Sequence, residues 1–264
     1  FMLPYNPLQT LLLEKSQKIL VMTSGNISDE PIAYQDEEAL QRLKNIADYF
    51  LVHNREIYMR CDDSVARVFN EKEMTIRRSR GYVPFPVVLE GYFKKPILAV
   101  GGELKNTFCM CRENYAFLSH HIGDLENAET LESFEKGIEH FKKILTFVPQ
   151  VVAYDLHPRY LSTQYAKKLS EFEIVGVQHH HAHCASCMAE NALTGKVIGV
   201  ALDGTGYGED GNIWGAEFLI ADENSYKRFA HLKYMPLPGG ESAIKEPWRM
   251  GVTLLYDAFG NDMN

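Results

Sequence analysis

The stretch EIVGVQHHHAHCASCMAEN, residues 173–191, combines a short apolar run with four of the chain's ten histidines. The apolar part, EIVGVQ, predicts a buried strand. The remainder is rich in alanine and predicts a helix whose first turn contains the histidines. Strands that lead into helices are typical of α/β proteins, whose ligand sites lie at the rim of the sheet. The stretch therefore predicts an α/β fold and a site at the start of this helix.

Strands and helices alternate through the rest of the chain, which again indicates an α/β protein. A glycine-rich turn joins two predicted strands on each side of the histidine stretch. Outside residues 173–191, the predicted elements are a strand at 19–22, a helix at 36–53, short strands within 62–70 and 74–81, paired strands within 96–119, a helix at 131–147, a strand at 151–157, a helix at 160–170 and paired strands within 196–221.

A run with three prolines and two glycines, GYVPFPVVLEGYFKKP at residues 81–96, interrupts both the helical and the strand periodicity. We interpret residues 91–96 as a linker. The sequence therefore predicts one domain over residues 1–90 and a second over residues 97–264.

Composition argues against several classes of protein. The formal net charge is -8, whereas nucleic-acid-binding proteins usually have a basic surface. No apolar run approaches the length of a membrane span, and the first residues do not resemble a secretory signal. Five cysteines form no disulfide framework. We expect a cytoplasmic protein that binds neither nucleic acid nor membrane.

His179 and His183 have the i, i+4 spacing that places two side chains on one face of a helix. Exposed helices also contain such pairs, so the spacing alone is weak evidence for a metal site. The pair is not the zinc-protease motif, because His180 stands where that motif has glutamate. Asp203, at the end of a predicted strand, is a candidate third ligand. Two imidazoles and a carboxylate suit iron or zinc.

Two glycine-rich loops follow predicted strands, VGGELKNT at residues 100–107 and ALDGTGYGEDG at 201–211. Glycines let backbone N–H groups approach phosphate oxygens, although neither loop is a Walker A motif. An ordinary hairpin explains each loop equally well. The basic cluster RRSRG at residues 77–81 also suits a phosphate or nucleotide.

Taken together, the motifs resemble the HypF family, the carbamoyltransferases of [NiFe]-hydrogenase maturation. Two groups of motifs carry the resemblance. The first resembles the second half of a YrdC-like domain: TSGNISDEPI at 23–32, DDSVARV at 62–68 and IRRSRGYVPFPV at 76–87. The second resembles the TsaD-like domain that follows: LAVGGELKNTFC at 98–109, LSHHIGDLENAET at 118–130, YDLHPRYLST at 154–163, VQHHHAH at 177–183 and ALDGTGYGEDGNIWGAE at 201–217.

The resemblance implies part of a YrdC-like α/β domain followed by the first lobe of an actin/Hsp70-like domain, and thus an internal fragment, inactive by itself, of a longer enzyme. That enzyme would use carbamoyl phosphate and ATP, with magnesium, to form carbamoyl adenylate. It would then transfer the carbamoyl group to the C-terminal cysteine of HypE, as the precursor of the cyanide ligands of the hydrogenase.

The resemblance also assigns residues of the YrdC-like part. Ser24 and Asn26 match its S-x-N nucleotide motif, and Ser64 matches the serine of its second motif. Arg78 and Arg80 lie in the basic motif on the phosphate side, and the sequence does not decide which of them contacts phosphate.

In the TsaD-like part, His179 and His183 match the H-x-x-x-H metal ligands, with Asp203 as the candidate third ligand. Lys105 and Asn106 match the first glycine-loop motif, which would face a second nucleotide or the carbamoyl group. We expect these two residues to be catalytic.

Two other functions fit parts of the pattern. YrdC-like and TsaD-like proteins also make threonylcarbamoyl-adenosine on tRNA, but the net charge and the motifs ELKNTFC and HHIGDLENAET argue against that acceptor. A non-catalytic, metal-binding interaction module is the other alternative.

Overall fold

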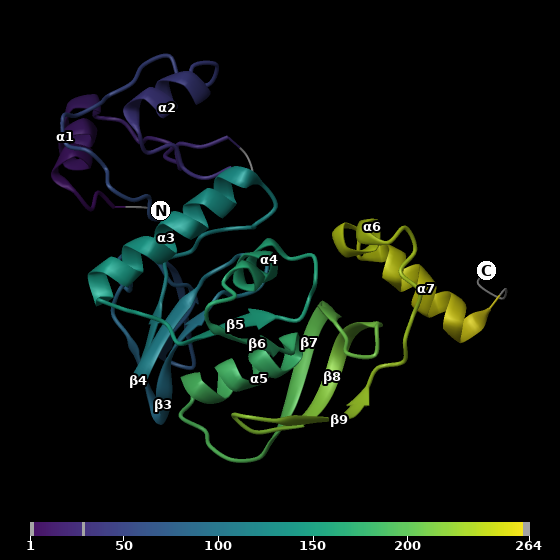
Figure 1. Cartoon of the computed structure of the whole chain (residues 1–264). Coiled ribbons are helices and arrows are strands. Elements are labelled where there is room, and N and C mark those ends of the chain that lie inside the picture. The colour runs from purple at the N-terminus through teal and green to yellow at the C-terminus, as the bar shows by residue number, and fades with distance from the viewer. Residues whose placement is uncertain (1–2, 28–29, 261–264) are drawn as a thin grey trace. The chain divides into compact units, whose positions relative to one another are not determined.

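The computed structural model describes residues 3–27 and 30–260. Contacts divide the chain into two units, Phe1–Arg60 and Cys61–Asn264. Strands and helices alternate in the second unit (Figure 1), which confirms the predicted α/β class.

The unit Phe1–Arg60 has two helices, α1 (Pro7–Ser16) and α2 (Asp36–Arg42), and neither contains a buried residue. The predicted strand at 19–22 is wrong, because this segment pairs with no strand and exposes most of its side chains. The predicted helix at 36–53 ends early, at Arg42. A strand needs a partner strand for its hydrogen bonds, and an amphipathic helix needs a neighbour that buries its apolar face.

The second unit begins with a hairpin of β1 (Val65–Phe69) and β2 (Lys72–Arg77). Asn70 and Glu71 form its turn, with φ values of 49° and 62°. Positive φ at both central residues matches the twist of a two-residue hairpin turn. The hairpin lies within the region in which the sequence predicts a nucleotide site.

The next strand, β3 (Val87–Ala99), contains the residues interpreted as a linker. It pairs antiparallel with β4 (Cys109–Leu118), and the register shifts twice, between Val88 and Phe93 and between Phe93 and Ile97. The glycine and proline that suggested a linker therefore interrupt the pairing and leave the strand continuous. Residues 91–96 are therefore part of a strand, and the domain boundary at this point stays a prediction.

A four-stranded sheet has the order β4-β3-β5-β6. Both β5 (Val151–Asp155) and β6 (Glu173–Val177) run parallel to β3, and β5 pairs with both β3 and β6. The helix α3 (Ala128–Leu145) precedes β5, and α4 (Leu161–Lys168) connects β5 to β6. Helical crossovers are the usual way to join parallel strands.

The main core lies between this sheet and α3, which crosses it in Figure 1. Phe108 is fully buried and contacts Phe134 and Phe141 edge to face, at ring-centroid distances of 6.0 and 5.2 Å. The amphipathic pattern that predicted a helix at 131–147 thus places its apolar face in this core.

A second, three-stranded sheet has the order β7-β8-β9 and is antiparallel. Its strands are β7 (Val197–Tyr207), β8 (Ile213–Ala221) and β9 (Tyr226–His231). The histidine helix α5 (His179–Glu190) packs against β7 and β8. A smaller core of Cys184, Ala201, Leu219 and Ala221 lies between them.

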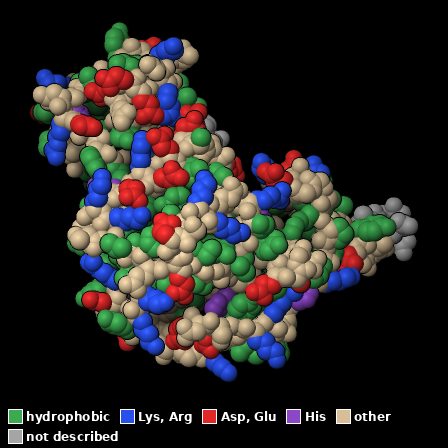
Figure 2. Space-filling model, in the orientation of Figure 1, with side chains coloured by type: hydrophobic (Ala, Val, Ile, Leu, Met, Phe, Trp, Pro, Cys, Tyr) green, Lys and Arg blue, Asp and Glu red, His purple; other side chains and the backbone are tan. Residues whose placement is uncertain are grey.

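The last helices are α6 (Glu241–Lys245) and α7 (Trp248–Phe259), and α7 buries none of its residues. Acidic and basic side chains are interspersed over the face drawn in Figure 2. None of the helices in the described ranges combines the length and apolar character that crossing a membrane requires.

Candidate metal centre

The strand-to-helix junction places two histidines side by side. Gln178 is the N-cap of α5, and its side-chain oxygen accepts a hydrogen bond from the His181 N–H at 2.9 Å. This cap starts the helix at His179, immediately after β6. His179 and His183 then lie one turn apart, and their Nε2 atoms are 3.2 Å from each other. The i, i+4 spacing therefore has the geometry that the sequence predicts.

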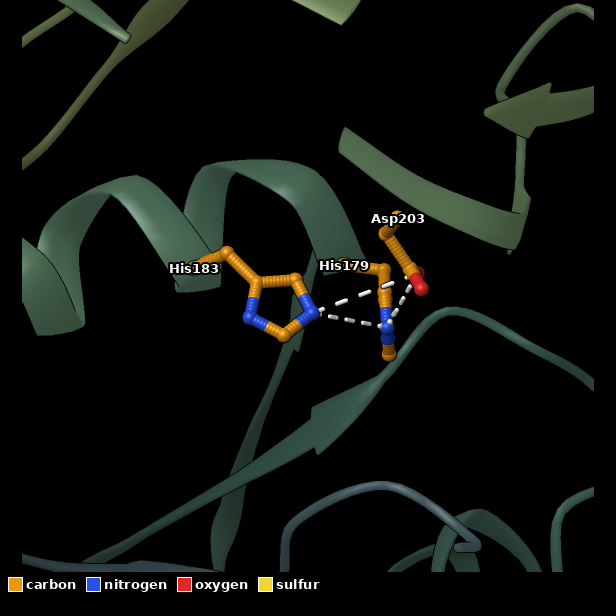
Figure 3. A group of neighbouring side chains, drawn as sticks. All are labelled: His179, His183 and Asp203. Carbon is orange, nitrogen blue, oxygen red and sulfur yellow. Dashed lines mark hydrogen bonds and ion pairs between the residues drawn. The ribbon is translucent and has the colours of Figure 1, made fainter. Parts of the chain in front are cut away.

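Asp203 completes a triad from a different sheet, and the three side chains point toward one another in Figure 3. Its Oδ2 lies 3.0 Å from His179 Nε2 and 3.9 Å from His183 Nε2. A pairing irregularity of β7 falls directly after Leu202, where Asp203 sits. Bulges of this kind re-aim side chains next to functional sites.

The triad has the donor set and spacing of a metal site. Nitrogen and oxygen ligands about 2.0–2.2 Å from one ion lie about 3–3.5 Å from each other, which is close to two of the three observed distances. Asp203 Oδ2 is also buried, and no described donor makes a hydrogen bond to it with suitable geometry. A buried, unsatisfied carboxylate oxygen between two imidazole nitrogens fits a cation.

The charges of the triad are strongly coupled. A hydrogen bond to Asp155 and the nearby carboxylate of Asp203 raise the pKa of His179 to about 9. Burial and the positive charge of His179 lower the pKa of His183. The neighbouring His179, which carries the proton, lowers the pKa of Asp203. Without a metal the site therefore holds a proton on His179, which a cation would have to displace.

Asp155, the last residue of β5, is a residue of the site that was not predicted from the sequence. Its Oδ2 lies 2.6 Å from His179 Nδ1, and its side chain is only 8% exposed. Its position at the end of a predicted strand could have indicated it, because the carboxyl ends of neighbouring parallel strands meet at one edge of a sheet. Asp155 ends β5, and its register partner Val177 ends β6, just before the histidines.

The other histidines and the cysteines of α5 point away from the triad. His180 is fully buried, and its Nδ1 lies 3.2 Å from Gln178 Nε2. His181 Nε2 lies 2.8 Å from the carbonyl oxygen of Asp222. Cys184 is buried in the smaller core, and Cys187 is exposed. These neighbours attach α5 to the second sheet and leave the triad to His179 and His183.

Glycines let α5 approach β7 closely. A Cβ atom at Gly206 would lie 2.4 Å from His180 Cε1, and one at Gly199 would lie 2.3 Å from Cys184 Sγ. Neither position has space for a side chain, so glycine is required by packing. In the loop at 201–211, Gly206 thus has a packing role, whether or not the loop also binds a phosphate.

The first glycine loop is held by Asn106, which is buried. Its Nδ2 donates hydrogen bonds to the carbonyls of Val100 and Gly102, at 2.9 and 2.6 Å. Lys105 is exposed, has a φ of 49°, and donates its backbone N–H to Asp124. Asn106 therefore shapes the loop, while the Lys105 side chain is accessible. Their catalytic role stays a prediction.

Ser64, Arg78 and Arg80 lie together in the second unit. Ser64 Oγ accepts a hydrogen bond from the Ser79 N–H and donates one to the Arg80 carbonyl, at 2.9 and 2.8 Å. Arg78 donates to the carbonyl of Phe85, and Arg80 pairs with Asp63 at 3.1 Å. These contacts stabilise the segment, and the assignment of a phosphate contact stays a prediction.

Ser24 and Asn26 lie in the first unit. Ser24 Oγ donates a hydrogen bond to Asn26 Oδ1 at 2.6 Å, and Asn26 Nδ2 donates to the carbonyls of Ile27 and Glu30. The S-x-N motif is thus a locally closed turn. Its proposed contact with a nucleotide is not tested by this arrangement.

Comparison with family models matches almost the whole chain in three parts. Residues 93–190 match the HypF Kae1-like domain. Residues 199–264 match the second subdomain of the carbamoyltransferase Kae1-like domain. Residues 1–79 match the Sua5, YciO and YrdC family, which is described as telomere recombination.

Curated proteins and solved structures give the same assignment. The chain is 45% identical to carbamoyltransferase HypF of Synechocystis sp. and 40% identical to probable carbamoyltransferase HypF of Methanocaldococcus jannaschii, over 100% and 99% of its length. In both cases it spans about a third (34%) of the relative.

The crystal structure of full-length HypF in the phosphate- and nucleotide-bound form superposes with a TM-score of 0.90 at 55% identity, over 97% of this chain and 40% of that one. The crystal structure of T. kodakarensis HypF gives a TM-score of 0.83 at 43% identity, over 90% of this chain and 32% of that one. Both the fold and the sequence are therefore similar to those of these proteins.

Proposed function

Because the chain belongs to the HypF family of carbamoyltransferases, we propose that it forms the metal-binding part of an ATP-dependent carbamoyl transfer. The observation that carries the proposal is the triad of His179, His183 and Asp203, whose ligand atoms all lie within 4.8 Å of one another. The chain spans 34% of the length of the Synechocystis relative. We therefore assign the complete reaction to a protein of that full length.

We propose iron or zinc as the metal, because both accept imidazole and carboxylate ligands. His179 and His183 would each bind through Nε2, and Asp203 through Oδ2. When bound, the cation would supply positive charge beside a phosphate or carbamoyl oxygen and hold that group in place. Asp203 Oδ2, which has no described hydrogen-bond donor, would gain the partner that it lacks.

The proposed substrates are carbamoyl phosphate and ATP with magnesium. Hydrolysis of carbamoyl phosphate would give carbamate and inorganic phosphate, and the carbamate oxygen would then attack the α-phosphate of ATP, giving carbamoyl adenylate and releasing pyrophosphate. In the transfer, a thiolate attacks the carbamoyl carbon, the bond from that carbon to the phosphate oxygen breaks, and AMP leaves. The proposed acceptor is the C-terminal cysteine of HypE. Adenylation is useful because carbamate is a poor electrophile without a good leaving group.

The remaining predicted residues have proposed roles around the nucleotides. In the first unit, we propose Ser24 and Asn26 as nucleotide contacts. In the second unit, we propose Ser64 as a nucleotide contact and either Arg78 or Arg80 as a phosphate contact. In the first glycine loop, the exposed Lys105 is better placed to reach a ligand than the buried Asn106. We therefore propose Lys105 as the ligand contact and Asn106 as the residue that shapes the loop.

Metal binding by the full chain tests the proposal directly. Titration calorimetry with Zn²⁺ should show about one tight site, and His183→Ala and Asp203→Asn should each weaken it by at least about tenfold. His53→Ala is the matched control, because this exposed histidine lies in the first unit and outside the triad. Equal affinities in all three variants would remove the triad as the metal site.

A full-length family member tests the reaction. Loss of the histidine equivalent to His183 should abolish carbamoyl transfer and spare ATP–pyrophosphate exchange that depends on carbamoyl phosphate. Unchanged transfer would contradict the proposed role of the metal. Exchange driven by threonine and bicarbonate would favour tRNA modification.

A further inference from the structure

We infer that Asp155 is a positioning residue that holds His179 in the one tautomer and orientation able to bind the metal. The inference rests on the metal site proposed above and assigns a role to a carboxylate outside the triad. Metal-ligating histidines commonly donate their second ring N–H to such a carboxylate. Four observations support this role for Asp155.

The first observation is the contact itself. Asp155 Oδ2 lies 2.6 Å from His179 Nδ1, the ring nitrogen that does not face the triad. A carboxylate oxygen accepts hydrogen bonds, so Nδ1 must carry the proton. In the neutral imidazole this leaves the lone pair on Nε2, which lies 3.2 Å from His183 Nε2 and 3.0 Å from Asp203 Oδ2. The Asp155 contact therefore directs the metal-binding nitrogen into the triad.

The second observation is that Asp155 is itself fixed. Its Oδ1 accepts a hydrogen bond from the His157 N–H at 2.8 Å, and its carbonyl accepts one from Thr163 Oγ1 at 2.7 Å. Thr163 is buried in α4. Both carboxylate oxygens and the backbone thus have partners, so the side chain cannot rotate without losing a hydrogen bond. A fixed acceptor is what orienting an imidazole requires.

The third observation is the difference between the two carboxylates that contact His179. The side chain of Asp155 is 8% exposed and contacts Nδ1, whereas that of Asp203 is 32% exposed and contacts Nε2. The triad of possible ligands includes Asp203 and not Asp155. One carboxylate is therefore placed as a ligand, and the other is buried behind the ring.

The fourth observation is the topology. Asp155 and Val177 are the last paired residues of β5 and β6, and α5 begins two residues after Val177. The parallel pairing of these strands thus determines that Asp155 lies beside the first residue of the helix. The contact depends on the register of the sheet and not on a mobile loop.

The test compares Zn²⁺ affinity of the full chain, by competition with a chromophoric chelator, among wild type, Asp155→Asn and a control. Asp155→Asn keeps the size of the side chain but can present an amide N–H to Nδ1, which favours the wrong tautomer. We expect its affinity to fall about 10–100-fold. Asp62→Asn is the matched control, because Asp62 also contacts the Nδ1 of a histidine, His121, at 2.6 Å, and lies outside the triad.

A spectroscopic readout separates positioning from a general loss of structure. In the Co²⁺-loaded chain, the shifted ring N–H proton of His179 should be visible in the wild type, and exchange with solvent should remove the signal in Asp155→Ala. If Asp155→Ala does not fold, the affinity of the near-isosteric Asp155→Asn decides.

The outcomes distinguish this inference from the proposed function. A wild-type chain that binds no Zn²⁺ overturns the metal centre and the role of Asp155 with it. Tight binding in both wild type and Asp155→Asn overturns the role of Asp155 alone. Equal weakening in Asp155→Asn and Asp62→Asn also overturns it, because the effect would then come from charge or stability in general.

Discussion

Replacing Gly206 by alanine would test whether the close fit of α5 against β7 holds the candidate metal centre together. A Cβ atom at this position would lie 2.4 Å from His180 Cε1 and 3.0 Å from its Nδ1. Carbon atoms in contact stay about 3.5–4.0 Å apart, so the ring would have to move by about 1 Å. His180 is fully buried, and the ring can move that far only if α5 or β7 shifts.

The size of the effect follows from this clash. Overpacking a core costs about 1–3 kcal/mol, and we expect the upper part of this range, about 2–3 kcal/mol, because a rigid buried ring cannot avoid the new methyl group. In a chain of this length each kcal/mol lowers Tm by about 2–4 °C, so Tm should fall by about 4–12 °C. His179 directly precedes His180 in α5, so Zn²⁺ affinity should fall as well.

Thermal unfolding followed by circular dichroism, with and without Zn²⁺, measures both effects. Gly204→Ala is the control, because a Cβ atom at Gly204 would meet nothing within 4 Å. We expect it to change stability by at most about 0.5 kcal/mol. Gly206→Ala should lower the free energy of unfolding much less in a His180→Ala chain than in the wild type, because the ring that the new methyl group would meet is then absent. Equal costs in the two backgrounds, or equal Tm losses for the two glycine variants, would refute the packing argument.

Three further predictions concern the second unit. Without metal, the free energy of unfolding should fall as pH rises from 6.5 through 9, because the folded chain keeps the proton of His179, whose pKa is raised to about 9 from 6.5. The loss should be up to about 3 kcal/mol, measured by urea unfolding with a chelator present, and a pH-independent stability would contradict it. Glu217→Ala should lower the free energy of unfolding by about 3 kcal/mol, because Glu217 is buried and accepts hydrogen bonds from Arg228 through both oxygens at 2.6 and 2.9 Å. A change under 1 kcal/mol in urea unfolding would show that the pair contributes little. Phe108→Ala should lower the free energy of unfolding by about 3–5 kcal/mol. The control Phe229→Ala, at a 70% exposed position, should lower it much less in the same assay. Similar losses in the two variants would contradict the assigned core.

Local periodicity explains why parts of the fold were predictable. The apolar spacing of residues 131–147 predicts a helix, and α3 covers residues 128–145 with its apolar face in the core. The spacing of His179 and His183 is likewise set by the helical repeat. Patterns of this kind depend on a few neighbouring residues, so they are legible in the sequence.

Elements that depend on distant partners were predicted less well. Residues 19–22 have the apolar composition of a strand but pair with no strand in the structure. Residues 91–96 have the glycine and proline of a linker, yet β4 pairs with β3 on both sides of them. Composition describes what a segment tolerates, whereas strand formation requires a partner at the right register.

The sequence by itself determined the α/β class, the two metal-binding histidine candidates and the type of their third partner. Only the tertiary structure decided which carboxylate faces which nitrogen of His179. Asp155 is 24 residues before His179 in the chain and Asp203 is 24 residues after it, so separation along the chain does not tell them apart. The parallel pairing of β5 with β6 brings the first to Nδ1, and the packing of α5 on β7 brings the second to Nε2. Roles that depend on such long-range contacts become visible only when the sheets are assembled.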